Sequence, residues 1–457
     1  MALPTESQIQ LDAIFKAYDI RGRTDTGELD GEAARAIGRA FAGFISAHYP
    51  NVLEVVVGRD CRDSSPWLAD ALMTGIQLGG LSVADAGEVA TDMIYYASGA
   101  LEVPGVMITA SHNPSEYNGI KLCGPGASPI GVESGLIAIR QTAGESLPDV
   151  APQGRRRTVS IAGGYIDHLF SIVDAAAISD LKVAVDGGNG MAGVVVEDVF
   201  ARTAASLVGL YLEPDGTFPN HPANPLEPEN LVDLVELVMS DHPDLGVAFD
   251  GDADRAFFVD ELGVPLSGST TTALIARWFL ERKPGASIVH NLITSRAVAE
   301  TILKAGGVPI RTKVGHSYIK QIMAETGAVF GGEHSGHYYF KENFRADSGM
   351  LAMLVLLQVM SEAGRPLSEL RSTVEPYCQS GEINLSVVDK AGAIERLAAA
   401  FGDGSQDDLD GLTVGWADEW FNVRASNTEP VLRINVEAST DERVGALLHQ
   451  IQSIIGG

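Results

Sequence analysis

Short runs of β-branched and aliphatic residues alternate along the chain with stretches in which apolar residues recur every three or four positions. Continuous apolar runs that end in small or charged residues are typical of buried strands, and they occupy residues 54–60, 182–190, 245–250 and 287–291. The helical spacing is found at residues 64–78, 231–239 and 271–280. This alternation predicts several α/β layers.

Length and turn-forming residues divide the chain into four units. At roughly 100–200 residues per domain, 457 residues exceed one ordinary core. Residues 146–160, with two Pro, one Gly and three consecutive Arg, indicate a linker, and so do residues 364–376. We therefore expect domains at residues 1–150, 151–255, 256–371 and 372–457.

The last unit differs from the others. Strands are expected at residues 420–424 and 431–438, on either side of a polar turn, and a closing helix at residues 441–455. The predicted fold class is therefore α/β, with three α/β domains of mixed sheets and helices followed by a smaller C-terminal α+β domain.

Composition narrows the classes of function. The 32 Lys and Arg against 60 Asp and Glu give a net charge of −28, which disfavours nucleic acid and anionic membranes as partners. The most apolar stretch, residues 350–360, is about half of the roughly 20 residues that a membrane span needs. Cys61, Cys123 and Cys378 form neither a disulfide framework nor a zinc pair. With no signal-peptide pattern at the start, the expected location is the cytoplasm.

Three aspartates, Asp250, Asp252 and Asp254, follow a predicted strand at alternate positions. Small residues separate them, so the carboxylates can converge on one hard cation such as Mg²⁺. One alternative is an EF-hand calcium loop with Glu261 at its twelfth position, but Arg255 stands where that loop needs Gly. The other alternative is an acidic, solvated turn.

A hydroxyl-bearing loop at residues 109–114 follows another apolar run. Because Pro114 disfavours helix immediately before it, Ser111 is expected on a tight loop at the end of a strand, where nucleophiles are commonly presented. The glycines of the hydrolase elbow are absent, and a sequence neighbour such as His112 seldom points correctly for a triad. A turn whose polar side chains cap their own backbone is the alternative.

Two further loops carry polar clusters. Residues 331–337 place a carboxylate, a hydroxyl and two imidazoles between glycines, which suits the recognition of sugar hydroxyls and proton transfer near neutral pH. An ordinary polar loop and a partial zinc site are the alternatives there. Residues 424–430 offer a guanidinium, three short polar side chains and backbone amides, which suit a phosphate dianion, although turn composition alone also produces such loops.

Taken together and in this order, the motifs resemble those of the α-D-phosphohexomutase family, most closely its phosphomannomutase/phosphoglucomutase branch. The resemblance extends from residues 15–22 to the loop at Arg424. It implies four domains around a central cleft, each contributing one loop. It also implies an isomerase that interconverts hexose 1-phosphate and hexose 6-phosphate through a phosphoserine and a hexose 1,6-bisphosphate, which serves as intermediate and activator.

The resemblance also assigns roles to individual residues. Ser111 matches the phosphorylated serine, and the Mg²⁺ ligands are Asp250, Asp252, Asp254 and an oxygen on Ser111. Tyr18 and Arg21 resemble the residues that flank the phosphoserine, and Lys121 matches a Lys that assists proton transfer there. His337 matches a residue of the sugar-reading loop, and either Lys121 or His337 can serve as general base. The residues expected to bind substrate are Tyr18, Arg255, Lys313, His316, Glu333, Ser335, His337, Arg424, Ser426, Asn427 and Thr428.

Two positions depart from the family pattern. His334 stands where many members have Met and the glucosamine branch has Gln, and Ile293 lies near the position of a cleft Lys in some relatives. The expected substrate is a mannose phosphate, with a glucose-preferring mutase and a phosphoserine-type sugar phosphatase as alternatives; a calcium-responsive binding protein is the non-enzymatic alternative. The expected partners are small-molecule sugar phosphates, with the chain a monomer or weak dimer. Binding is expected to rotate the C-terminal domain about residues 372–379.

Overall fold

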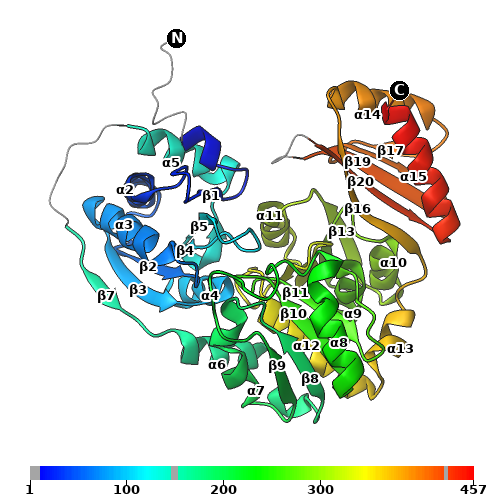
Figure 1. The fold of residues 1–457 in the computed structure, drawn as a ribbon, viewed down its shortest axis with the longest axis horizontal. Helices are drawn as coiled ribbons and strands as arrows, with labels where there is room; N and C mark the ends of the chain where they lie inside the picture. The colour runs from blue at the N-terminus through cyan, green and yellow to red at the C-terminus, as the bar shows by residue number, and fades with distance from the viewer. Residues whose placement is uncertain (1–10, 146–152, 427–430, 457) are drawn as a thin grey trace.

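The computed structural model describes residues 11–145, 153–426 and 431–456. Four sheets follow one another along the chain, and helices pack around them (Figure 1). The N-terminal domain lies at the upper left of Figure 1 and the C-terminal domain at the upper right, with the two middle domains joining them below. The expected fold class is confirmed.

The first sheet has seven strands, in the order β1-β5-β4-β2-β3-β7 with β6 beside β5. Asp30 caps helix α2 by accepting a hydrogen bond from the Ala33 amide. The backbones of α2 and α3 approach so closely that a Cβ on Gly38 would lie 2.2 Å from the Leu72 carbonyl oxygen. The elements are β1 (Ile20–Arg23), α2 (Gly31–His48), β2 (Glu54–Arg59), α3 (Ser65–Leu78), β3 (Ser82–Glu88), α4 (Thr91–Leu101), β4 (Gly105–Ile108), β5 (Tyr117–Gly124), β6 (Ser128–Pro129), α5 (Leu136–Ala143) and β7 (Arg156–Thr158).

Strand β7 lies inside the segment expected to be a linker. It pairs in parallel with β3, and Arg156 forms an ion pair with Asp85 at 2.8 Å while Arg157 reaches Glu54 at 2.6 Å. The first sheet therefore continues past residue 150, and only part of residues 146–160 is left to connect the domains. Residues 146–152 lie outside the described residues.

The second sheet has four strands in the order β11-β10-β8-β9. Its elements are α6 (Ala162–Ile172), β8 (Lys182–Asp186), α7 (Val196–Phe200), β9 (Ser206–Leu210), α8 (Val232–Asp241), β10 (Leu245–Phe249) and β11 (Ala256–Asp260). Strand β11 begins directly after Arg255 and pairs antiparallel with β10. The sheet therefore extends beyond the boundary expected at residue 255, because the aspartate loop is the turn of a hairpin rather than the end of the domain.

The third sheet has the order β13-β12-β14-β15. The apolar residues 350–360 form a helix buried in the protein core, and helix α13 occupies part of the segment 364–376 that was expected to be a linker. Among the described residues, no helix combines the length and apolarity needed to cross a membrane. The elements are α9 (Gly268–Arg282), β12 (Ser287–Asn291), α10 (Arg296–Lys304), β13 (Val308–Thr312), α11 (His316–Thr326), β14 (Phe330–Gly332), β15 (Tyr338–Phe340), α12 (Gly349–Ala363) and α13 (Leu367–Ser372).

The fourth sheet is antiparallel, in the order β16-β20-β19-β18-β17. Its elements are β16 (Cys378–Ser386), α14 (Lys390–Ala400), β17 (Ser405–Asp407), β18 (Leu412–Gly415), β19 (Glu419–Ala425), β20 (Val431–Ala438) and α15 (Asp441–Gly456). One apolar core runs through the first three domains, from Val56 to Val374, and the first domain has a second core, from Leu11 to Ala143. The C-terminal domain has a separate core, from Ala393 to Ile455.

Candidate active site

The aspartate loop turns between β10 and β11 and buries its three carboxylates. Asp250, Asp252 and Asp254 each present an oxygen within 4.8 Å of the others, and all three are at most 1% exposed. Within the described part of the chain, the second oxygens of Asp252 and Asp254, Oδ1 in both, accept no hydrogen bond. Burial, together with the charges of the two neighbouring carboxylates, raises the pKa of Asp250. A buried set of three carboxylates that offers only oxygen ligands fits Mg²⁺.

Lys121, on β5 of the first domain, faces this loop. Its Nζ lies 2.6 Å from Asp252 Oδ2 and 2.5 Å from Asp254 Oδ2. Burial disfavours the charged ammonium, but the two carboxylates outweigh it and raise the pKa of Lys121. Lys121 therefore carries a positive charge that partly neutralises the aspartates.

Ser111 lies on the loop between β4 and β5, with its backbone in the left-handed region at φ 54°. Its Oγ donates a hydrogen bond to Asp250 Oδ2 at 2.7 Å, and Arg255 Nη2 donates to the same Oγ at 3.1 Å. The serine is 1% exposed. The structure thus brings the serine loop and the aspartate loop, 139 residues apart in sequence, into direct contact.

Arg21 and Tyr18 border the serine loop from the start of the first domain. Arg21, on β1, donates from Nη1 to Asn113 Oδ1 at 2.6 Å and pairs through Nε with Asp19 at 2.7 Å. Tyr18 donates from its hydroxyl to the Val314 carbonyl at 3.0 Å. Tyr18 therefore connects the first domain to the third, just before helix α11.

The loop between β14 and β15 carries Glu333, Ser335 and His337 and lies beside the aspartate loop. Glu333 is 2% exposed and accepts hydrogen bonds from the Tyr339 hydroxyl at 2.7 Å and the Gly315 amide at 3.1 Å. His337 lies 2.9 Å from Ser335 Oγ through Nδ1, and its Nε2 is 3.6 Å from Asp254 Oδ1. Burial, followed by the charge of Arg255, lowers the pKa of His337.

Arg424 is the penultimate residue of strand β19 in the C-terminal domain. Its Nη2 donates to Glu382 Oε2 at 2.5 Å, and Arg433 reaches the other oxygen of Glu382 at 2.9 Å. Ser426 closes the hairpin through its amide, which donates to the Val431 carbonyl at 3.0 Å. Asn427 and Thr428 lie outside the described residues, so their predicted roles stay predictions.

Lys313 lies just before helix α11, and His316 is the first residue of that helix. The ammonium of Lys313 lies 6.0 Å from the centre of the Tyr318 ring. The side chain of His316 is outside the described part of the structure. Lys313 is therefore placed close to the contact that Tyr18 makes with the third domain.

Three buried residues of this site, Thr91, Lys320 and Asp347, could not be identified from the sequence. Thr91, at the start of α4, donates from Oγ1 to Asp252 Oδ2 at 2.5 Å. Asp347 lies 4.0 Å from His337 Nε2 and pairs with Lys320 at 2.7 Å. Each belongs to an ordinary helix or turn sequence, and only its long-range partner gives it a place in the site.

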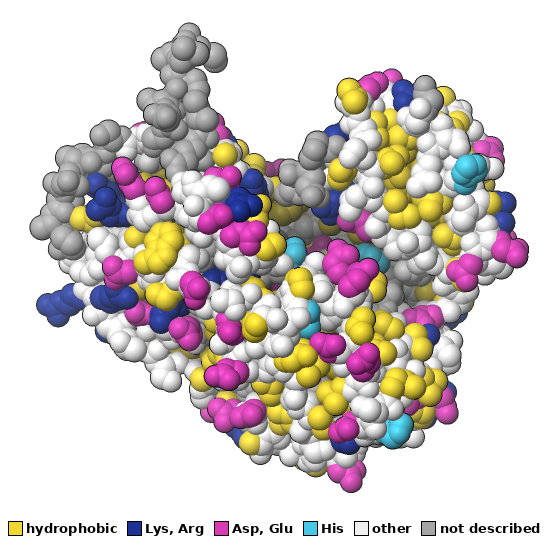
Figure 2. All heavy atoms as spheres, in the orientation of Figure 1, with side chains coloured by type: hydrophobic (Ala, Val, Ile, Leu, Met, Phe, Trp, Pro, Cys, Tyr) yellow, Lys and Arg dark blue, Asp and Glu magenta, His cyan; other side chains and the backbone are white. Residues whose placement is uncertain are grey.

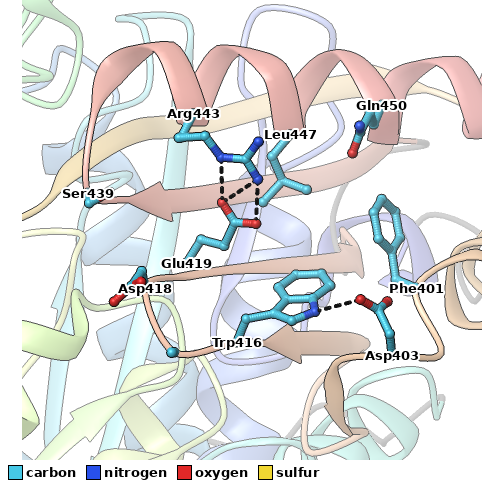
Figure 3. A pocket seen from close by; sticks show the side chains of 10 residues that line it. Phe401, Asp403, Trp416, Asp418, Glu419, Ser439, Arg443, Leu447 and Gln450 are labelled. Atoms are coloured by element: carbon cyan, nitrogen blue, oxygen red, sulfur yellow. Dashed lines mark hydrogen bonds and ion pairs between the residues drawn. The ribbon is translucent and has the colours of Figure 1, made fainter.

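Figure 2 shows a hollow in the upper edge of the molecule, between the N-terminal and C-terminal domains. A separate hollow of about 620 Å³ lies on the C-terminal domain (Figure 3). Its described lining includes Trp416 and the ion pair of Arg443 with Glu419 at 2.7 Å, but none of the residues predicted for the site. The contacts that join predicted residues lie elsewhere, where Ser111 and Lys121 of the first domain meet the aspartate loop and His337.

Comparison with known proteins matches every domain to one family. The models of phosphoglucomutase/phosphomannomutase alpha/beta/alpha domains I, II and III match residues 12–145, 163–263 and 267–377, and the model of the C-terminal domain matches residues 382–454.

Similar full-length proteins give the same family. Phosphohexose mutases of Xanthomonas campestris are 40% identical over 432 residues, covering 93% of this chain and 95% of theirs. A phosphomannomutase of Salmonella typhimurium is 40% identical over 439 residues with the same coverage. The crystal structure of a phosphoglucomutase/phosphomannomutase family protein from Burkholderia thailandensis superposes with a TM-score of 0.89 at 31% identity, over 99% of this chain and 97% of that one.

Proposed function

This chain belongs to the phosphoglucomutase/phosphomannomutase family and is a hexose-phosphate mutase, and from this premise we propose that mannose phosphates are its main substrates. The names of several similar proteins, including the phosphomannomutases of Salmonella typhimurium and Escherichia coli, support mannose. Glucose phosphates are the second candidate, because the family description includes both sugars.

Ser111 is the proposed carrier of the phosphoryl group, and its contact with Asp250 at 2.7 Å is the observation on which the proposal rests. In the first half-reaction the bond between phosphorus and Ser111 Oγ breaks, and a bond to the free sugar hydroxyl forms, which gives a hexose 1,6-bisphosphate. The bisphosphate then reverses its orientation and returns its other phosphate to Ser111. Positioning and charge neutralisation supply most of the acceleration in such a transfer.

The proposed Mg²⁺ ligands are Asp250, Asp252 and Asp254, with an oxygen on Ser111 completing the set. Their all-oxygen chemistry supports this assignment, as do the two buried carboxylate oxygens that accept no hydrogen bond from the described residues. When bound, the metal would neutralise phosphoryl charge and make the serine oxygen a better leaving group.

His337 is the proposed general base for the attacking hydroxyl. Burial lowers its pKa, so its imidazole is neutral and able to accept a proton at pH 7. Lys121, the other candidate, is charged and already donates to two carboxylates. We assign Lys121 instead to neutralising charge beside the transferred phosphoryl group.

The remaining loops are proposed to hold the substrate in both of its orientations. Glu333 and Ser335 would accept hydrogen bonds from the sugar hydroxyls, and Arg424 would bind the phosphate that is not being transferred. In the structure the Arg424 guanidinium donates a hydrogen bond to the Glu382 carboxylate at 2.5 Å. Substrate binding would therefore replace this carboxylate with the phosphate as the partner of Arg424. Because one chain supplies all four loops, we expect a monomer or weak dimer, which light scattering can test.

A coupled assay with mannose 1-phosphate and glucose 1-phosphate tests the proposal. We expect isomer rather than free phosphate, and a higher kcat/KM for mannose 1-phosphate. Intact mass before and after phosphatase treatment should show one labile phosphate, absent from Ser111→Ala, and that variant should lose turnover. Near-normal turnover of Ser111→Ala would contradict the assignment of the carrier, and release of free phosphate would favour the phosphatase alternative.

A further inference from the structure

Arg62 is the largest fully buried side chain in the described structure, with 0% exposure. It lies in the turn between β2 and α3, beside the serine loop. It pairs through Nε with Asp60 Oδ2 at 3.1 Å. None of the functional motifs includes it, so its burial calls for a separate explanation.

The guanidinium of Arg62 binds the backbone of the serine loop at four points. Nη2 donates to the carbonyls of Ser111 at 2.8 Å and Asn113 at 2.6 Å. Nη1 donates to the carbonyls of Pro114 at 2.6 Å and Tyr117 at 3.1 Å. With Nε on Asp60, all five N–H groups of the guanidinium have acceptors.

These contacts join the two ends of the loop that carries the proposed nucleophile. The Ser111 backbone is in the left-handed region, at φ 54°, a conformation that a residue with a Cβ keeps only when its surroundings enforce it. Arg62 holds the carbonyl of that same residue. The planar guanidinium suits this task because it presents its donors in a fixed fork, whereas an ammonium presents three donors from one point.

The second domain covers Arg62 from the other side. The ring centre of Phe218 lies 4.9 Å from the guanidinium carbon, and a Cβ on Gly216 would lie 2.4 Å from the Cα of Arg62. The guanidinium therefore lies between the serine loop and a loop of the second domain, in a place without solvent exposure. Its hydrogen bonds are strong there because water does not compete for them.

We propose that Arg62 is a positioning residue for phosphoryl transfer, which fixes Ser111 Oγ against Asp250 by holding the carbonyls of the loop from Ser111 to Tyr117. The inference rests on the proposed role of Ser111 as phosphoryl carrier. Arg62 reaches the reaction only through the backbone, since its donors are taken up by four carbonyls and Asp60.

The test measures mutase turnover of Arg62→Lys and Arg62→Ala on mannose 1-phosphate and glucose 1-phosphate. A displacement of about 1 Å in a reacting group lowers turnover about 100-fold, so we expect kcat to fall by that order while KM stays unchanged or decreases. Guanidinium ion added at concentrations below those that denature should restore part of the turnover of Arg62→Ala, but not that of Arg62→Lys. Should Arg62→Ala fail to fold, the kcat and KM of Arg62→Lys decide.

Leu72→Ala is the matched control, because Leu72 is fully buried in the same domain and contributes to α3. It should lower the melting temperature without lowering kcat at temperatures where the protein is folded, and guanidinium should not raise its turnover. Near-wild-type kcat in Arg62→Lys, or a loss that follows melting temperature as it does in Leu72→Ala, would overturn the inference. Full turnover in Ser111→Ala would instead overturn the proposed function, whatever Arg62→Lys shows.

Discussion

Replacing Lys121 with Met tests whether the aspartate loop is the metal site. The substitution keeps most of the side-chain volume but removes the ammonium that lies 2.6 Å from Asp252 and 2.5 Å from Asp254. The Lys121 side chain is 13% exposed, and the two carboxylates are at most 1% exposed. The variant therefore leaves buried negative charge without its nearest cation.

The expected cost depends on the metal. Removing one partner of a buried ion pair typically destabilises a protein by about 3–5 kcal/mol. In EDTA we expect a loss of this order, because Arg255 is then the nearest remaining cation on the loop, 3.2 Å from Asp250. With saturating Mg²⁺ the loss should be much smaller, because a divalent cation bound to the native state neutralises the same carboxylates.

Thermal unfolding of wild type and Lys121→Met, each in EDTA and in Mg²⁺, measures the difference. Lys182→Met is the control: its exposed ammonium lies 3.6 Å from Asp241, and such a pair contributes at most about 1 kcal/mol, with no dependence on Mg²⁺. An equal loss of stability for Lys121→Met in EDTA and in Mg²⁺ would refute the metal assignment.

Three further predictions concern other buried groups. Burial lowers the pKa of His290 to about 4. Its contribution to stability is therefore complete above the unfolded-state pKa near 6.5 and falls by on the order of 3 kcal/mol as the pH drops toward 4. His290→Gln should remove this loss, which urea unfolding at a series of pH values measures. Burial raises the pKa of Asp92 to about 7, so its contribution is lost as pH rises from about 4 through 7, and Asp92→Asn should flatten the stability profile over that range. Arg424→Met should raise KM about 10- to 100-fold through loss of a charge-assisted hydrogen bond to phosphate, while the exposed Arg443→Met should not; a change in kcat alone would argue against the phosphate site.

Much of the fold followed from the hydrophobic pattern, because buried strands and amphipathic helices differ in apolar period. Strands β2, β8, β10 and β12 and helices α3, α8 and α9 formed where this period predicted them. Strand β7 was missed since its three residues are Arg, Arg and Thr, all exposed. Backbone pairing with β3 and ion pairs to Asp85 and Glu54 make it a strand, and neither partner is near it in sequence.

The sequence predicted the site residues only where several of them are grouped on one loop. The aspartate loop and the serine loop each show their residue types locally, and the structure brings Ser111 to Asp250. Lys320 and Asp347 form a buried pair from separate elements, and Arg62 binds carbonyls 49 to 55 positions away. Nothing in their local sequence distinguishes such residues from surface charges, because their environment is set by tertiary packing.

The first three domains share an apolar core, whereas the fourth domain has a core of its own, so the fourth is joined to the others less tightly than they are to one another. Parting any two of the first three would expose apolar side chains to water, whereas the fourth is also held by polar contacts such as those from Arg296 to the carbonyls of Trp416 and Glu419. If the bound sugar reorients as proposed above, the C-terminal domain is the part of the site that can move without opening the core shared by the other three. An antibody or small molecule that immobilised the C-terminal domain would consequently arrest turnover while touching none of the reacting groups.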